Sequence, residues 1–315
     1  ARAFRSMTVL LLESLHADAH ALLAAASEVL VDATPEVSTA GPPFPHVRAI
    51  LTRGRGRVTA ALVARCPSLQ VVARAGVGLD NVDLAACRQR GIPVLYAPGA
   101  NTATTAEHAI ALLLALVRRI AVTARAVAEG RWDDRAHYAG DEACGKTLGI
   151  VGFGAIGQRV ARIASALGMR VVVAAHPGLV SEHPVLPLPA LLQQADFVSL
   201  HLPLRSDTRG ILGAAEFALM KPGACLINTA RGAHIDQQAL TVALASGRLG
   251  GFAADVLDVE PPAAGEPLLR SDRVLITPHI ASLTASTYRQ MCLITARNVL
   301  AVLAGERPEA RCVYR

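Results

Sequence analysis

The stretch "GIVGFGAIGQRVA", Gly149 to Ala161, decides the fold of the longer half of this chain. It sets Gly152, Gly154 and Gly157 in a G-x-G-x-x-G pattern, straight after a strand-like apolar run and at the head of a helical pattern. The first glycine permits a tight turn, the second lets backbone approach a pyrophosphate, and the third allows close contact between helix and strand. The helix N-terminus offers free N–H groups to the phosphates. The alternative is a glycine turn needed only for packing, but the complete strand–glycine–helix–strand context favours a dinucleotide site.

Short apolar runs alternate with helical patterns along the whole chain, and most of them end near Gly, Pro or Asn, as buried parallel strands do. The runs are MTVLLLES, VRAILTR, LQVVARAG, IPVLYAPG, TLGIVGFG, MRVVVAAH, DFVSLHLP, ACLINTA, GGFAADVL and RVLITPHI. We therefore predict an α/β fold with two doubly wound, Rossmann-like parallel-sheet lobes and a ligand cleft between them. Residues 1–97 with 288–315 form the expected substrate domain, and residues 98–287 form the expected NAD(P)-binding domain. One long helix is expected over residues 101–127.

Composition narrows the class of protein. The chain has 315 residues, of which 52% are hydrophobic and 18% charged, enough for sizeable cores. Apolar runs such as Ala109 to Val117 are too short to span a bilayer, so no membrane partner is expected. The net charge of +6 comes from scattered arginines and aromatic residues make up only 3%, which argues against nucleic-acid binding and suits small anionic substrates. Six scattered cysteines without metal-ligand spacing predict free thiols in a reducing cytoplasm and no metal site.

Polar residues follow three of the later strand-like runs. "INTARGAHID" contains Arg231, "ADVLDVEPP" contains Asp255 and Glu260, and "ITPHIAS" contains His279. Taken singly, these side chains are ordinary strand-end or surface residues. Together, an arginine fork can hold a carboxylate and an adjacent carbonyl oxygen, a histidine can exchange a hydroxyl proton, and a glutamate favours the imidazolium. With a nicotinamide nearby, these groups could interconvert a 2-oxo acid and a 2-hydroxy acid.

The stretch "VVVAAHPG", Val171 to Gly178, carries His176 where a ribose-binding acid is usual, about twenty residues beyond the glycines. A neutral imidazole can hydrogen-bond a ribose hydroxyl, and a protonated one can pair with a 2′-phosphate. Arg205 could add positive charge there. We therefore expect both NAD and NADP to serve.

From Met7 onward the sequence resembles the D-isomer-specific 2-hydroxyacid dehydrogenases, in particular glyoxylate and hydroxypyruvate reductases. The agreement runs, in the family's order, through AGVGLDNVD, NTATTAEHA, GFGAIGQ, LHLPLRSDTRGIL, LMKPGACLINTARG, GFAADVLDVEPP and TPHIAS. The resemblance implies an NAD(P)-dependent oxidoreductase for short 2-oxo acids such as glyoxylate and hydroxypyruvate. It implies that Arg231 binds the carboxylate and the carbonyl of the substrate. It also implies that His279 is the catalytic acid and base, and that Glu260 is the partner of His279.

The resemblance implies further contacts. Arg53 and the backbone N–H groups of Val77 and Gly78 are expected to bind substrate, and Asp255 is expected to contact the nicotinamide carboxamide. The expected cofactor residues are Gly152, Gly154, Ala155, Ile156, Gly157, His176, Pro203, Thr229, Ala230 and Asp255. A homodimer through the cofactor domain is also implied, with the segment from Asn101 and its apolar face "AIALLLALV" at the contact.

Other activities fit this resemblance less well. Formate dehydrogenases of the superfamily carry glutamine where Glu260 stands, which argues against formate as substrate. The chain ends soon after its last helix, so the regulatory domain of many phosphoglycerate dehydrogenases is not expected. The alternative from another class is a nicotinamide-sensing, co-repressor-like binding protein, since such proteins can retain the same Arg–Glu–His set. Turnover would separate the two.

Overall fold

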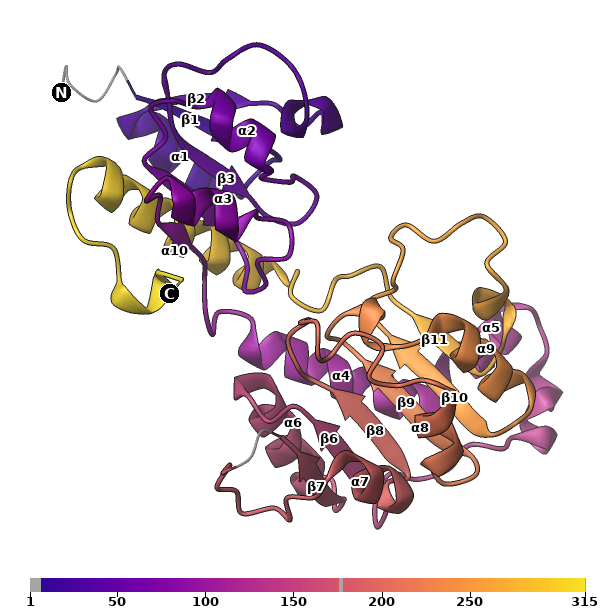
Figure 1. The fold of residues 1–315 in the computed structure, drawn as a ribbon. Helices are drawn as coiled ribbons and strands as arrows, with labels where there is room; N and C mark the ends of the chain where they lie inside the picture. Colours follow the sequence, from indigo (N-terminus) through magenta and orange to yellow (C-terminus); the bar gives the residue numbers. More distant parts are fainter. Residues whose placement is uncertain (1–6, 176–177, 315) are drawn as a thin grey trace. The chain divides into compact units, whose positions relative to one another are not determined.

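A computed structural model describes residues 7–175 and 178–314, in which the chain folds into two compact units. Unit 1 comprises the chain up to Asn101 together with the segment from Leu283 onward, and unit 2 comprises Thr102–Ser282. In each unit a wholly parallel sheet lies between layers of helices (Figure 1). The predicted α/β class with two Rossmann-like parallel sheets is confirmed.

The sheet of unit 1 has five strands in the order β2-β1-β3-β4-β5. Their bounds are β1 Thr8–Leu11, β2 Glu28–Val31, β3 Val47–Thr52, β4 Val71–Arg74 and β5 Val94–Leu95. All four residues of β1 are buried, and so are five of the six in β3. Burial on both faces explains why these strands appear in the sequence as continuous apolar runs rather than as alternating ones.

Helices cover both faces of this sheet. One core contains Leu23 of α1 with Cys292, Ala296 and Val299 of α10, and the other contains Leu62 of α2. The helical segments of unit 1 are α1 Ala17–Ala26, η2 Pro35–Ser38, α2 Ala60–Arg65, α3 Leu84–Gln89, α10 Ala285–Leu303 and η6 Ala310–Cys312. The last long helix of the chain therefore packs in the same unit as the first strands.

The sheet of unit 2 has six strands in the order β11-β10-β9-β8-β6-β7. Their bounds are β6 Thr147–Val151, β7 Arg170–Ala174, β8 Phe197–Leu200, β9 Ala224–Asn228, β10 Leu249–Ala254 and β11 Val274–Ile276. The helical segments are α4 Thr102–Val117, α5 Ile120–Ala128, η3 Trp132–His137, α6 Ala155–Ala166, α7 Leu188–Gln194, α8 Ala214–Leu219, η4 Gly232–His234, α9 Gln237–Ala245 and η5 Pro267–Arg270. Helices α4 and α6 pack on one face and α7, α8 and α9 on the other.

The strand orders create one topological switch point in each sheet. In unit 2 the helix after β6 covers one face and the helix after β8 covers the other, so the loops after these neighbouring strands diverge. In unit 1 the same relation holds between β1 and β3. Open α/β sheets bind ligands in the crevice at such a point, at the carboxyl ends of the strands.

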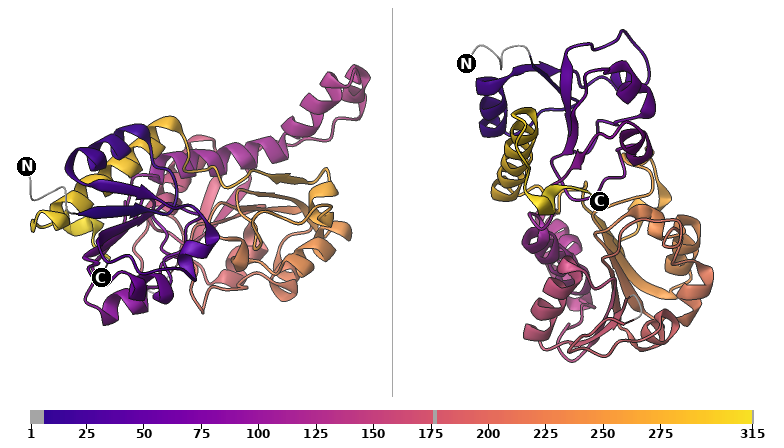
Figure 2. Two further views of the ribbon diagram at one scale, coloured as in Figure 1. Left: turned by 90° about the horizontal axis from the view of Figure 1, so that it is seen from above. Right: turned by 60° about the vertical axis from the view of Figure 1, so that its left-hand side comes forward.

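Two local features differ from the expectations. The edge strand β2 was not predicted, because three of its four residues are exposed and the run is short. The helix expected over 101–127 is two helices, since Arg119 has a left-handed backbone with φ of 52° between α4 and α5. The buried face of α4 extends from Thr104 to Leu113, whereas α5 buries only Ala126 and extends away from the sheet as an arm (Figure 2).

Candidate active site

The polar residues singled out in unit 2 follow three neighbouring strands. Arg231 lies three residues beyond the end of β9, Asp255 directly follows β10, and His279 lies three residues beyond β11. Because β9, β10 and β11 are adjacent and parallel, their carboxyl ends lie at one edge of the sheet. The glycine loop after β6 lies at the same edge.

His279 and Glu260 form a hydrogen-bonded pair. Nδ1 of His279 lies 2.7 Å from Oε2 of Glu260, while the N–H of Leu257 donates to Oε1 at 2.9 Å. The side chains of His279 and Glu260 are 45% and 37% exposed, so both can meet a ligand. His279 has a left-handed backbone with φ of 56°, which is uncommon outside glycine and frequent at functional sites. Its Nδ1 is engaged, which leaves Nε2 for a ligand.

The electrostatics of the pair favour an ionised carboxylate. Burial alone would raise the pKa of Glu260, but hydrogen bonds from His279 and from the Leu257 N–H, together with the positive charges of His279 and Arg231, hold that pKa below its ordinary value. Glu260 is therefore an anion at neutral pH. An anion at this position stabilises the protonated form of the imidazole beside it.

Two residues shape the loop that carries Arg231. The fully buried side chain of Asn228 accepts a hydrogen bond from the Ala230 N–H at 2.9 Å and donates one to the Arg231 carbonyl oxygen at 2.8 Å. A Cβ at Gly232 would stand 2.0 Å from the carbonyl carbon of Leu257. Glycine at this position therefore lets the Arg231 loop approach the segment that leads to Glu260.

Asp255 supports the turn that carries His279. Its side chain is 1% exposed, and its carboxylate accepts hydrogen bonds from the Thr277 hydroxyl at 2.6 Å and from the N–H groups of Ile280 and Ala281 at 2.9 and 2.7 Å. His108 of α4 was not assigned a role from the sequence, although it lies in the quoted segment NTATTAEHA. Its Nε2 is 2.9 Å from the Thr277 hydroxyl and 3.5 Å from Asp255. The expected contact of Asp255 with a carboxamide stays a prediction.

The glycine loop has the geometry that a pyrophosphate needs. Gly152 has φ of 93°, and a Cβ there would stand 2.6 Å from the carbonyl oxygen of His201. A Cβ at Gly157 would stand 2.3 Å from the Gly152 carbonyl oxygen, whereas one at Gly154 would meet nothing within 4 Å. Helix α6 begins at Ala155 without a side-chain cap, so its first N–H groups face this open space. These residues fit a dinucleotide.

The other expected cofactor residues lie beside this loop or along the same edge. Ile156 is in the first turn of α6, Pro203 follows β8, and Thr229 and Ala230 follow β9. Among the described residues, the buried Thr229 hydroxyl has no hydrogen-bond partner, as a group awaiting a ligand would. His176 lies outside the described residues, so its role stays a prediction.

Arg205, which was expected to add positive charge near the ribose, lies in the loop after β8. Its side chain is 62% exposed and pairs with Asp207 at 3.1 Å. An arginine with a neighbouring acid as partner contributes less net charge to a phosphate site.

The substrate residues expected in unit 1 follow β3 and β4. Arg53 comes directly after β3, and Val77 and Gly78 lie three and four residues after β4. Within residues 7–175 and 178–314, the backbone N–H groups of Val77 and Gly78 donate no hydrogen bond. Two free adjacent N–H groups at a strand end suit a carboxylate.

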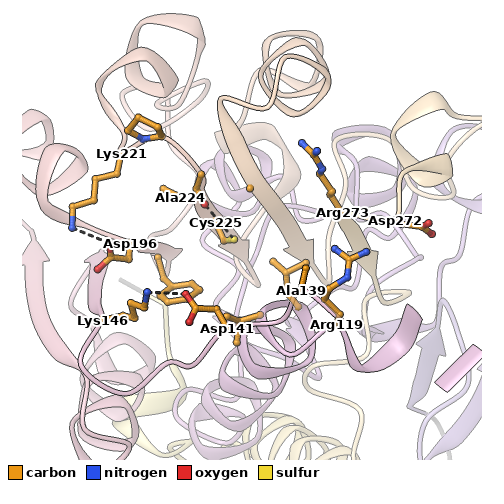
Figure 3. A pocket seen from close by; sticks show the side chains of 16 residues that line it. Arg119, Ala139, Asp141, Lys146, Asp196, Lys221, Ala224, Cys225, Asp272 and Arg273 are labelled. Atoms are coloured by element: carbon orange, nitrogen blue, oxygen red, sulfur yellow. Dashed lines mark hydrogen bonds and ion pairs between the residues drawn. The ribbon is translucent and has the colours of Figure 1, made fainter. Parts of the chain in front are cut away.

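A pocket of about 320 Å³ lies elsewhere in unit 2 (Figure 3). It opens among the amino-terminal ends of the strands, where Lys146 pairs with Asp141 at 2.7 Å and Lys221 with Asp196 at 2.8 Å. This edge is opposite the glycine loop, so the pocket is separate from the candidate active site. In the described part of the chain, no group of three or more metal-ligating side chains is found and no helix is long and apolar enough to cross a membrane.

Residues 110–281, more than half of the chain, match the model of the D-isomer specific 2-hydroxyacid dehydrogenase NAD binding domain. The chain belongs to the D-isomer-specific 2-hydroxyacid dehydrogenase family. The matched segment contains the glycine loop, Arg231, Glu260 and His279.

Relatives of this chain include a hydroxypyruvate reductase of Thermotoga maritima, 40% identical over 79% of this chain and 82% of that protein. A D-3-phosphoglycerate dehydrogenase of Archaeoglobus fulgidus is 38% identical over 83% of this chain, but the match spans only half of that longer protein. Among solved structures, the NADPH-dependent glyoxylate/hydroxypyruvate reductase of Sinorhizobium meliloti, in complex with NADP and malonate, superposes with a TM-score of 0.88 at 27% identity, over 98% of both chains.

The glycine loop generates a paired prediction. Gly157→Ala should lower stability by about 1–3 kcal/mol, because its Cβ would collide with the Gly152 backbone. Gly154→Ala should cost less than about 1 kcal/mol, because its Cβ meets open space, yet it should weaken dinucleotide binding where the phosphates are expected. Thermal denaturation and fluorescence titration with NADH and NADPH measure the two effects. Normal affinity in Gly154→Ala would show that the phosphates bind elsewhere.

Proposed function

We propose that this protein is an NAD(P)-dependent oxidoreductase that interconverts a short 2-oxo acid and the corresponding D-2-hydroxy acid. The observation that carries the proposal is the 2.7 Å His279–Glu260 pair at the sheet edge that also carries Arg231 and the Gly152–Gly157 loop. The names of the Thermotoga maritima and Sinorhizobium meliloti relatives support glyoxylate and hydroxypyruvate as leading substrates. Nothing in these relatives favours the co-repressor-like alternative.

Each catalytic side chain has a defined task in this proposal. His279 exchanges a proton with the substrate oxygen through Nε2, because Nδ1 is held by Glu260. Arg231 binds the carboxylate and polarises the adjacent carbonyl with its planar fork. In unit 1, the N–H groups of Val77 and Gly78 and the guanidinium of Arg53 would bind the substrate. The reduced nicotinamide, when bound, supplies a hydride to the carbonyl carbon.

The cofactor would be held by the Gly152–Gly157 loop and the first N–H groups of α6, with Ala155 and Ile156 against the pyrophosphate. Pro203, Thr229 and Ala230 would line the nicotinamide side, and Asp255 would contact the carboxamide. With His176 in place of an acid, we propose that NADH and NADPH both serve, within about tenfold in kcat/KM. The NADP-bound relative supports this choice.

The two units would divide the work. Unit 2, which contains the segment that matches the NAD-binding domain, would be the cofactor domain, and unit 1 the substrate domain. The six cysteines are unpaired, which supports a reducing, cytoplasmic location.

The assay that tests the function is NAD(P)H oxidation with purified protein and a panel of 2-oxo acids. The panel holds glyoxylate, hydroxypyruvate and the oxo acid that corresponds to the 3-phosphoglycerate named for the Archaeoglobus fulgidus relative. We expect turnover with at least one of them, and His279→Ala should lower kcat by about a hundredfold or more while cofactor affinity is kept. No turnover with any member would contradict the function, and normal kcat in His279→Ala would contradict the assignment of His279.

A second kinetic prediction concerns Glu260→Gln. Because the pKa of Glu260 lies below its ordinary value, the carboxylate is negatively charged across neutral pH. A negative charge stabilises a neighbouring imidazolium, whereas the neutral amide of glutamine does not. The variant therefore lacks the negative charge beside the proton donor. The alkaline limb of kcat/KM for reduction should therefore move down by about one pH unit. An unshifted profile would mean that the pair does not control proton donation.

We further propose a homodimer through the arm of unit 2. The apolar face of α4 expected at the contact is buried in its own unit, at Ala109, Ile110, Leu112 and Leu113. Exposed apolar side chains lie instead along α5 and beyond, where Ile120, Val127 and Trp132 are 53%, 52% and 63% exposed. Such side chains in a projecting arm support a contact with a second copy.

Val127→Asp should convert the dimer to a monomer, because a charge would be buried in the contact. Val242→Asp in α9, at an apolar site that is 64% exposed, is the matched control and should leave the mass unchanged. Light scattering after size-exclusion chromatography measures both. A monomeric parent protein would overturn the proposal.

A further inference from the structure

Glu13 lies at the switch point of the unit 1 sheet. It follows β1 by two residues, and the loop of residues 53–56 directly follows the neighbouring strand β3. The carboxyl ends of the strands on either side of a switch point form the ligand crevice of an open α/β sheet. The contacts of Glu13 thus belong to the part of unit 1 where a ligand is expected.

One oxygen of Glu13 organises the whole loop. Oε1 accepts hydrogen bonds from four successive backbone N–H groups, at 2.8 Å from Arg53, 2.6 Å from Gly54, 3.0 Å from Arg55 and 3.2 Å from Gly56. Successive N–H groups that converge in this way form an anion-binding concavity. Here the chain fills it with the carboxylate of Glu13, whose side chain is only 8% exposed.

The other oxygen of Glu13 orients the Arg53 side chain. Oε2 lies 3.2 Å from Nε of Arg53, and the guanidinium carbon lies 5.0 Å from the centre of the Tyr288 ring. The Arg53 side chain is 28% exposed. In the described ranges 7–175 and 178–314, its two Nη atoms make no hydrogen bond or ion pair, so the Nη edge of the fork remains available to a carboxylate.

Glu13 is charged under working conditions. Burial alone would raise its pKa, but the backbone hydrogen bonds of Gly54, Arg53 and Gly56 and the charge of Arg53 outweigh burial and hold the pKa below its ordinary value. The ion pair with Arg53 is therefore present at neutral pH. A permanent anion at one edge of the guanidinium restricts Arg53 to one orientation.

We infer that Glu13 is a positioning residue that presents the Nη edge of Arg53 to the carboxylate of the 2-oxo or 2-hydroxy acid and thereby sets KM. The inference rests on the proposed function, since Arg53 must face that carboxylate. Glu13 does not touch the reacting atoms, so it should leave kcat largely unchanged.

Glu13→Gln separates the two tasks of this side chain. An amide oxygen can still accept the four backbone N–H groups, so the loop should keep its shape. The amide NH₂ must then face the N–H of Arg53, and two donors cannot hydrogen-bond each other. The variant therefore releases Arg53 and preserves its supporting loop.

We expect Glu13→Gln to raise KM for the 2-oxo acid by about tenfold, with kcat within about twofold and NAD(P)H affinity unchanged. The double variant Glu13→Gln/Arg53→Gln should have the same KM as the single variant Arg53→Gln, because Glu13 acts through Arg53. Asp18→Asn, which removes one negative charge from an exposed pair with Arg289 in the same unit, is the matched control and should leave KM unchanged.

The outcomes are distinct. Unchanged KM in Glu13→Gln, or an equal further rise in the Arg53→Gln background, overturns the inference and leaves the function standing. Absence of turnover in the parent protein overturns both. If Glu13→Gln does not fold, Arg53→Lys tests the inference instead. The single ammonium group of the lysine would be held by Glu13 and would not reach the substrate carboxylate, so KM should rise as in Arg53→Gln. A normal KM in Arg53→Lys overturns the inference.

Discussion

The buried carboxylate of Asp255 joins the end of β10 to the turn that carries His279, and the geometry of the candidate active site depends on this contact. An ionised carboxylate is costly to bury unless its oxygens are hydrogen-bonded. Three donors from residues 277–281 meet this requirement. Because they must all reach one small group, the turn is restricted to one conformation, in which His279 keeps its left-handed backbone and lies 2.7 Å from Glu260.

Unit 1 uses a similar device at its own switch point. Glu13 gathers four N–H groups of the loop after β3, as Asp255 gathers donors of the turn after β11. Loops beyond a strand end have no ladder partner for their N–H groups, and buried N–H groups must still be satisfied. A buried carboxylate meets this need for several residues at once. Rigid loops of this kind suit side chains that must be held to within a fraction of an ångström.

Close backbone approach is the second constraint on the candidate active site. A Cβ at Gly152 or Gly232 would stand within 2.6 Å of a backbone atom of another segment, and one at Gly157 would stand 2.3 Å from the Gly152 carbonyl oxygen of its own loop. At Gly152 and Gly157 this approach shapes the dinucleotide loop, and at Gly232 it brings the Arg231 loop to the segment that leads to Glu260. The glycines are therefore as important to the geometry of the site as the charged residues, because a side chain at these positions would keep the backbone segments apart.

Local patterns in the sequence determined the α/β class, ten of the eleven strands found in the described residues, the glycine loop, and the strand-end positions of Arg231, Glu260 and His279. These features depend on residue type and on neighbours a few positions away, which a single sequence displays. Only the tertiary structure decided that β2 pairs at the edge, that the helix breaks at Arg119, and that Glu13, His108 and Asp255 contact the loops of the candidate site. Glu13 lies 40 residues from Arg53 and Asp255 lies 26 from Ala281. Such contacts arise because parallel strands bring loops that are distant in the sequence to one edge of the sheet. No local sequence pattern predicts which N–H or O–H groups will donate to a buried carboxylate at that edge.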